Sequence, residues 1–165
     1  MKAETCNDIF IKVIDHYHIN NEVDSSYSNP FDRETLDFLL FEKCWIDTVQ
    51  WHLEDIIRSP NLDSKTGLSI KHRIDDSNQK RTDIVEKIDD YYFNIFKEKS
   101  ISTSKINTES PGWVVDRLSI LNLKIFHMNE QIERQDVSQE HVLNCGEKLN
   151  ILKKQRTDLS QSFDE

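Results

Sequence analysis

The apolar residues of the chain recur every three or four positions, which is the spacing of an α-helix rather than the alternation of a β-strand. A polar stretch over residues 20–30 interrupts this pattern, and Pro60 interrupts it again because proline cannot continue a helix. The pattern predicts five helices, over about Thr5–Ile19, Phe31–Ser59, Gly67–Lys97 and Ser110–Arg134, with the last beginning at Asp136 or Ser138.

Composition and turn length indicate how the predicted helices are arranged. The chain has 165 residues but only three glycines and three prolines, too few for the many turns of an all-β fold. The turns near Pro60 and Asp136 are short, so the helices that they join are antiparallel neighbours. We expect an all-α fold in a single domain over residues 1–165. It is an antiparallel bundle of four long helices plus a shorter N-terminal helix, with a flexible linker over residues 98–109.

The helix faces indicate which helix is central. The N-terminal helix carries one apolar face, formed by Ile9, Phe10, Val13, Ile14 and Tyr17. The fourth helix carries an apolar stripe that begins at Val114 and a second stripe that begins at Trp113. Because a helix with two apolar faces needs neighbours on both sides, the fourth helix is expected at the centre.

Polar residues interrupt these apolar stripes. They are Ser77 and Arg81 in the third helix, Asp116 and His127 in the fourth, and Arg156 in the fifth. On the second helix, the apolar arc of Leu36, Leu40 and Cys44 continues into Asp47, Trp51, Glu54 and Arg58. Burying an unpaired charge costs several kcal/mol, so buried members of this set need partners of opposite charge.

Positions along the helix axes suggest two such pairs. At about 1.5 Å per residue, Asp47 and Arg81 lie at similar depths below the turn at Pro60, and Asp116 and Arg156 lie at similar depths from the turn at Asp136. We therefore expect the pairs Asp47–Arg81 and Asp116–Arg156. Two interpretations remain open: the pairs fix helix register in a plain bundle, or they border a polar pocket that binds a ligand.

The net charge limits the choice of partners. The formal charge is −9, which argues against a nucleic-acid binder and against an anionic membrane surface, although a local arginine cluster can still bind a phosphorylated compound. The three cysteines, Cys6, Cys44 and Cys145, are expected to be buried free thiols in a reducing compartment. No apolar run is long enough for a membrane span and no signal peptide is recognisable, so we expect a cytoplasmic protein.

Metal chemistry has no specific motif in the sequence. His52 with Asp55 and His127 with Glu130 are pairs at helical spacing, but the usual Glu-x-x-His order is absent. The acidic residues Glu54, Asp55, Glu86 and Asp89 loosely resemble the magnesium ligands of all-helical nucleotide pyrophosphohydrolases. A divalent metal is therefore a possible cofactor, but the sequence assigns it no ligand.

Several longer segments resemble one protein family. They are residues 51–55, 71–75, 78–83 and 86–89, the run from Ser110 to Met128, and residues 155–159. The chain is similar over residues 31–163 to an uncharacterised bacterial family of all-helical proteins, domain of unknown function 4254 (DUF4254). The resemblance implies no activity, but it implies a link to cell-surface glycan synthesis. Trp113 and Thr82 depart from the family pattern, in which a small residue and Asn are expected.

The resemblance and the helical pattern select overlapping residues and lead to two hypotheses. In the first, a polar pocket between helices binds or acts on a phosphorylated sugar or nucleotide. Its ligand-binding residues are Arg58, Asn78, Arg81, Asp116 and Arg156, and its acid–base residues are Glu54 and His127. In the second, the protein is a non-catalytic adaptor that binds a partner protein, and its buried polar layer is purely structural.

Overall fold

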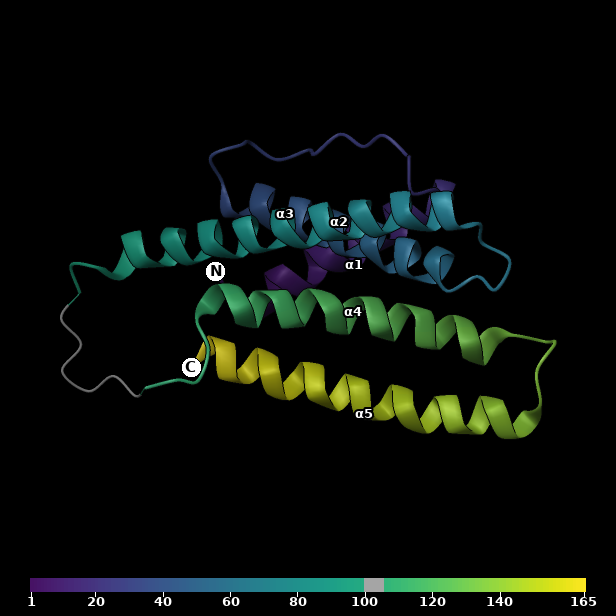
Figure 1. Ribbon diagram of the computed structural model, residues 1–165. Coiled ribbons are helices and arrows are strands. Elements are labelled where there is room, and N and C mark those ends of the chain that lie inside the picture. The colour runs from purple at the N-terminus through teal and green to yellow at the C-terminus, as the bar shows by residue number, and fades with distance from the viewer. Residues whose placement is uncertain (100–105) are drawn as a thin grey trace.

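The computed structural model describes residues 1–99 and 106–165, and these residues form five helices and no strand. The helices are α1 (Ala3–Asn20), α2 (Leu36–Ile57), α3 (Ser64–Phe96), α4 (Pro111–Glu133) and α5 (Gln139–Asp164). The predicted all-α bundle of four long helices and a shorter N-terminal one is confirmed (Figure 1). Residues 100–105 of the predicted linker 98–109 lie outside the described residues.

The helix starts differ from the predicted ones where a side chain caps the first turn. Helix α2 begins at Leu36, not at Phe31, because the Thr35 hydroxyl accepts a hydrogen bond from the backbone N–H of Phe38. Helix α3 begins at Ser64, three residues before the predicted Gly67, because the Asp63 carboxylate accepts two backbone N–H groups of the first turn.

The sequence offers two residues, Asp136 and Ser138, as the cap of the last helix. The Ser138 hydroxyl accepts a hydrogen bond from the backbone N–H of His141 at 3.2 Å, so Ser138 is the capping residue. Asp136 instead receives two hydrogen bonds from Arg134, at 2.9 and 2.8 Å, within the turn that joins α4 to α5.

Helix α4 lies at the centre of the bundle, as its two apolar stripes predicted. It contacts each of the other four helices, and α5 packs along it after the short turn (Figure 1). Helix α1 packs against α2, α4 and α5. The two ends of the chain meet, since the backbone N–H of Ala3 donates to the Asp164 carboxylate at 2.7 Å.

One apolar core joins α1, α2, α3 and α4. The predicted face of α1 is fully inside it: Ile9, Phe10, Val13, Ile14 and Tyr17 are all buried. Cys6, Cys44 and Cys145 are buried free thiols, as expected. Helix α5 contributes few fully buried residues and covers the outer side of α4.

The first turn of α4 is held by a side chain of α3. The Asp89 carboxylate accepts a hydrogen bond from the Ser110 hydroxyl and one from the backbone N–H of Gly112, both at 2.6 Å. Unpaired N–H groups at a helix start favour an anion, so Asp89 acts as a cap supplied by a neighbouring helix. This contact gives Asp89 a structural role in the packing of α4 against α3.

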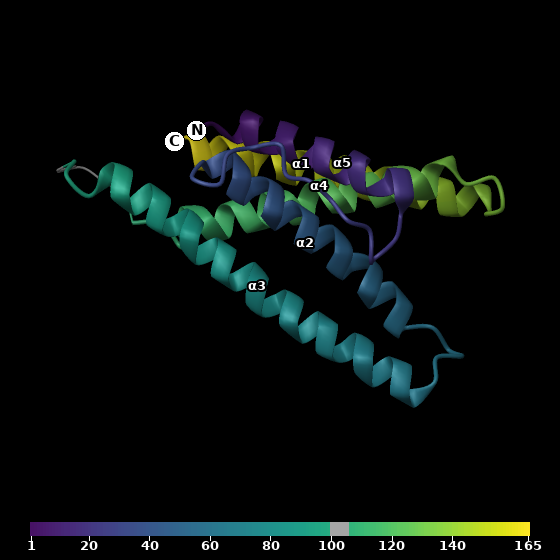
Figure 2. The same ribbon diagram turned by 90° about the horizontal axis from the view of Figure 1, so that it is seen from above.

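Helix α3 extends beyond the bundle at its C-terminal end, where it runs obliquely past the other helices (Figure 2). Phe93 and Phe96 on this end are 67% and 46% exposed. Across the described ranges, 1–99 and 106–165, no helix combines the length and the apolar character needed to cross a membrane.

Candidate functional site

A buried ion cluster connects α2, α3 and α4. Lys43 of α2 is completely buried and forms ion pairs with Asp47, one turn further along α2, and with Asp116 of α4 at 2.8 Å. Arg81 of α3 donates to both oxygens of Asp116 at 2.8 Å and lies 3.3 Å from Asp47. Two positive and two negative side chains therefore compensate one another inside the bundle.

The two carboxyl groups of this cluster have different pKa shifts. For Asp116, burial acts to raise the pKa, but hydrogen bonds from Arg81 and the nearby Lys43 ammonium outweigh it and lower the pKa overall. For Asp47, complete burial raises the pKa although Lys43 and the Ser119 hydroxyl, which donates at 2.6 Å, favour the charged form.

One predicted ion pair is confirmed and one is wrong. Arg81 and Asp47 lie in contact as predicted, but Asp116 pairs with Arg81 and Lys43 rather than with Arg156. Arg156 instead donates to the Asn122 side chain at 2.7 Å. The prediction compared depth along the helix alone, whereas Asp116 faces α2 and α3 and Asn122 lies on the side of α4 that packs against α1 and α5.

Lys43 is the member of the cluster that the sequence analysis missed. Its position was visible in the spacing, since Leu36, Leu40, Lys43 and Asp47 follow one another at steps of four, three and four along a packed helix face. A lysine at such a position, one turn before an aspartate, is a signal for a buried pair.

Three of the predicted site residues line one cavity, which borders the ion cluster at Asp47 and Arg81. Glu54 of α2, Arg58 directly after the last residue of α2, and Arg81 of α3 border a space of about 230 Å³, together with Trp51. The remaining walls are Asp47, Gln50 and Ile120. We call this space the arginine cavity.

The two arginines of the cavity differ in how firmly they are held. Arg81 is 26% exposed and uses Nε and Nη2 on Asp116, which leaves Nη1 with no hydrogen-bond partner among residues 1–99 and 106–165. Arg58 is 67% exposed, and within residues 1–99 and 106–165 its ion-pair partners are Glu54 and Asp55 of the adjoining last turns of α2, at 3.1 and 3.4 Å. Asn78 borders the region from α3, where it accepts a hydrogen bond from Gln50 at 2.8 Å.

His127 does not line this cavity, although the sequence predicts it as an acid–base residue of the same pocket as Glu54. Its ring stacks on the indole ring of Trp51, with ring centroids 4.8 Å apart. There it borders a larger cleft of about 610 Å³ between α2, α4 and α5. Arg156 borders a third space with Asn122. The predicted site residues therefore do not form one pocket. Glu54, Arg58 and Arg81 line the arginine cavity, whereas His127 and Arg156 border two other spaces.

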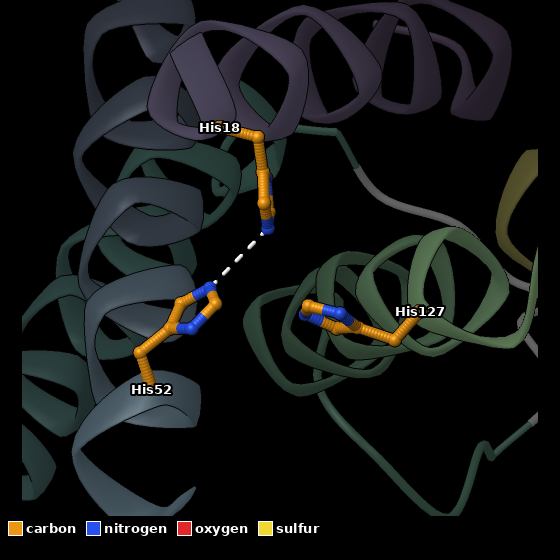
Figure 3. A group of neighbouring side chains, drawn as sticks. All are labelled: His18, His52 and His127. Atoms are coloured by element: carbon orange, nitrogen blue, oxygen red, sulfur yellow. Dashed lines mark hydrogen bonds between the residues drawn. The ribbon is translucent and has the colours of Figure 1, made fainter. Parts of the chain in front are cut away.

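His127 belongs instead to a group of three histidines, one from each of three helices. His18 lies near the end of α1, His52 on α2 and His127 on α4, and their side chains converge (Figure 3). One ring nitrogen of each lies within 4.8 Å of those of the other two. Partial burial lowers the pKa of His52 to about 4 and also lowers that of His18, so these two rings are neutral at physiological pH.

In comparisons with known proteins, the chain matches one family. The family described as "Protein of unknown function (DUF4254)" matches residues 37–165, which include α2 from its second residue and the whole of α3, α4 and α5, but not His18. No curated protein and no solved structure matches the chain.

Proposed function

Because the chain belongs to the DUF4254 family, whose description assigns no activity, we propose a function from the site itself: the arginine cavity binds a small phosphorylated ligand, a sugar phosphate or a nucleotide. The observation that carries the proposal is the presence of two guanidinium groups, Arg58 and Arg81, at one cavity with a carboxylate and an indole ring. Guanidinium groups match the oxygens of a phosphate in charge and in geometry.

The two arginines have complementary roles in this proposal. Arg81 is held by Asp116, so its Nη1 donates to a phosphate oxygen without losing an existing hydrogen bond. Arg58 leaves its own partners at little cost, because exposed pairs within one helix contribute about 0.3–0.5 kcal/mol. Arg81, held in place on α3, and Arg58, free to move at the end of α2, then bind the phosphate from two sides of the cavity.

The rest of the ligand extends over the other cavity residues. A space of about 230 Å³ is smaller than most small-molecule sites, so it accommodates the phosphate end, and the remainder packs on Trp51. Glu54 accepts a hydroxyl group of the ligand and is the carboxylate placed to exchange a proton with it. A phosphorylated sugar as ligand would agree with a cytoplasmic role in cell-surface glycan synthesis.

Arg58→Gln tests this proposal without disturbing the fold, since the side chain is exposed and its pairs are weak. We would first screen sugar phosphates, nucleotides and nucleotide sugars by thermal unfolding, with and without Mg²⁺. A compound at about 100 times its Kd raises the free energy of unfolding by about 2.7 kcal/mol, which is a shift of several degrees in Tm. Arg58→Gln should retain the Tm of the unliganded protein and lose most of this shift.

The matched control is Arg33→Gln. It removes the same charge from an exposed arginine that lies shortly before the N-terminal end of α2, far along the helix from Arg58. It should respond to the ligand like the wild type. A ligand shift that survives in Arg58→Gln, or that is lost equally in Arg33→Gln, would contradict binding in the arginine cavity.

A non-catalytic adaptor is the second candidate function. It is favoured by the apolar side chains on the projecting end of α3, where Phe93 and Phe96 are exposed. In this alternative the ion cluster only fixes the packing of α2, α3 and α4. A ligand screen in which no phosphorylated compound changes Tm would favour the adaptor over the arginine cavity.

A further inference from the structure

We propose that His18, His52 and His127 form a binding site for a divalent transition-metal ion, with zinc as its first candidate. The site is distinct from the arginine cavity and does not depend on the function proposed for it. Three ring nitrogens from three helices converge within 4.8 Å of one another, and neutral imidazole is a common ligand of Zn²⁺, Cu²⁺ and Ni²⁺.

Hydrogen bonds to the far sides of two rings orient them for this role. Nδ1 of His18 lies 2.7 Å from the backbone carbonyl of Ile14, and Nδ1 of His127 lies 2.6 Å from the Glu130 carboxylate. Both partners only accept, so each Nδ1 carries a proton, and Nε2 is the nitrogen through which each ring would bind a metal ion. Metal-binding histidines are typically held in this way, by a carbonyl or a carboxylate on the other nitrogen.

The nitrogens that remain have few alternative partners. Nε2 of His127 is buried and has no hydrogen-bond partner among the residues that the structure describes. Nε2 of His18 lies 3.2 Å from Nε2 of His52, a hydrogen bond in which one of the two nitrogens carries the proton and the other accepts it. A metal ion would replace that proton, which moves to Nδ1 of His52, and it would also give His127 Nε2 a partner.

The spacing agrees with a small ion of tetrahedral preference. At Zn–N distances of about 2.0–2.1 Å, tetrahedral ligand nitrogens lie about 3.3 Å apart, close to the distance from His18 to His52. His127 would come closer by rotation of its side chain. Three protein ligands leave one coordination position open, and His127 also borders the cleft of about 610 Å³ from which a water molecule or an anion would enter.

Carboxylates lie near the histidine cluster. Asp55 and Glu130 are close enough to act on the His52 ring, and Asp15 and Glu130 on the His18 ring, so their negative charge favours a bound cation. Lys124 and Lys148 line the cleft next to His127 and would attract an anionic fourth ligand.

The test uses the full chain without a polyhistidine tag, stripped of metal with a chelator. Zn²⁺ binding is measured by equilibrium dialysis, and Co²⁺ binding by the visible absorption of a tetrahedral complex, with Mg²⁺ as the hard-ion comparison. We expect one Zn²⁺ or Co²⁺ per chain and no binding of Mg²⁺. His18→Ala, His52→Ala and His127→Ala should each weaken Zn²⁺ binding at least about 100-fold.

Two further variants keep the result interpretable if a histidine variant fails to fold. Glu130→Gln changes an exposed residue that only supports His127, and it should weaken Zn²⁺ binding about 10-fold to 100-fold. His72→Ala removes an exposed histidine of α3 and should leave binding unchanged. The proposal is overturned if the wild type binds no Zn²⁺, or if Glu130→Gln and the folded histidine variants bind it as the wild type does. In either case the three rings would be an aromatic packing cluster only, like the neighbouring stack of Tyr17 on His52.

Discussion

Lys43→Met is expected to lower the free energy of unfolding by about 3–5 kcal/mol, because it removes the one ammonium group between two buried carboxylates. Arg81 alone cannot compensate both Asp47 and Asp116, and its two hydrogen bonds within the cluster go to Asp116. Chemical denaturation of the wild type and the variant measures the difference, with the midpoint shifting at constant slope.

The matched control is Lys71→Met, since Lys71 and Asp75 form a pair at the same helical spacing on the surface. Exposed pairs contribute little, so this variant should change stability by less than about 0.5 kcal/mol. A double variant, Lys43→Met with Asp47→Asn, should be more stable than Lys43→Met, because one carboxylate and one cation then remain. Equal effects of the two lysine variants would show that the cluster is not buried as described.

Gly112→Ala is expected to destabilise the protein by about 1–3 kcal/mol. A Cβ at this position would lie 2.5 Å from the backbone carbonyl of Val85 and 2.9 Å from the Asp89 carboxylate. Backbone cannot move aside as a flexible side chain does, so the start of α4 must shift away from α3 and stretch the hydrogen bond to Asp89. Thermal or chemical unfolding measures the loss.

Gly146→Ala is expected to stabilise the protein, in contrast to Gly112→Ala. Gly146 lies inside α5, and apart from its two neighbours and the nearby backbone of α5, no described residue has an atom within 4 Å of an added Cβ. Alanine should therefore raise stability by about 0.5–1 kcal/mol through its better helix propensity. If Gly112→Ala were also stabilising, the close approach of α4 to α3 would be contradicted.

The fold could be predicted from the sequence because helix period, caps and breakers all agree. The apolar face of α1 and the central place of α4 followed directly from the spacing of apolar residues. Helix starts were less predictable, because several polar residues near each start could act as the cap. The structure shows that Thr35 and Asp63 do so, through hydrogen bonds to backbone N–H groups of the first turn.

The candidate site could be predicted only in part, for a geometric reason. Polar residues at apolar positions identified Asp47, Arg81 and Asp116 as unusual, and the structure joins them in one cluster. The predicted partner of Asp116 was wrong because depth along an axis does not fix which face of α4 meets which helix. His18 was not selected at all, since no local spacing relates it to His52 and His127, and only the packing of α1 against α2 and α4 brings the three together.

The central claim, binding of a phosphorylated ligand in the arginine cavity, is tested most directly by arginine footprinting. Each arginine is modified with phenylglyoxal, with and without the best compound from the screen, and the extent at each site is read by mass spectrometry. We expect slower modification of Arg58, and of the half-buried Arg81, when the compound is bound, and no change at Arg33. Unchanged modification of Arg58 with the compound bound, or protection only at Arg156, would contradict it.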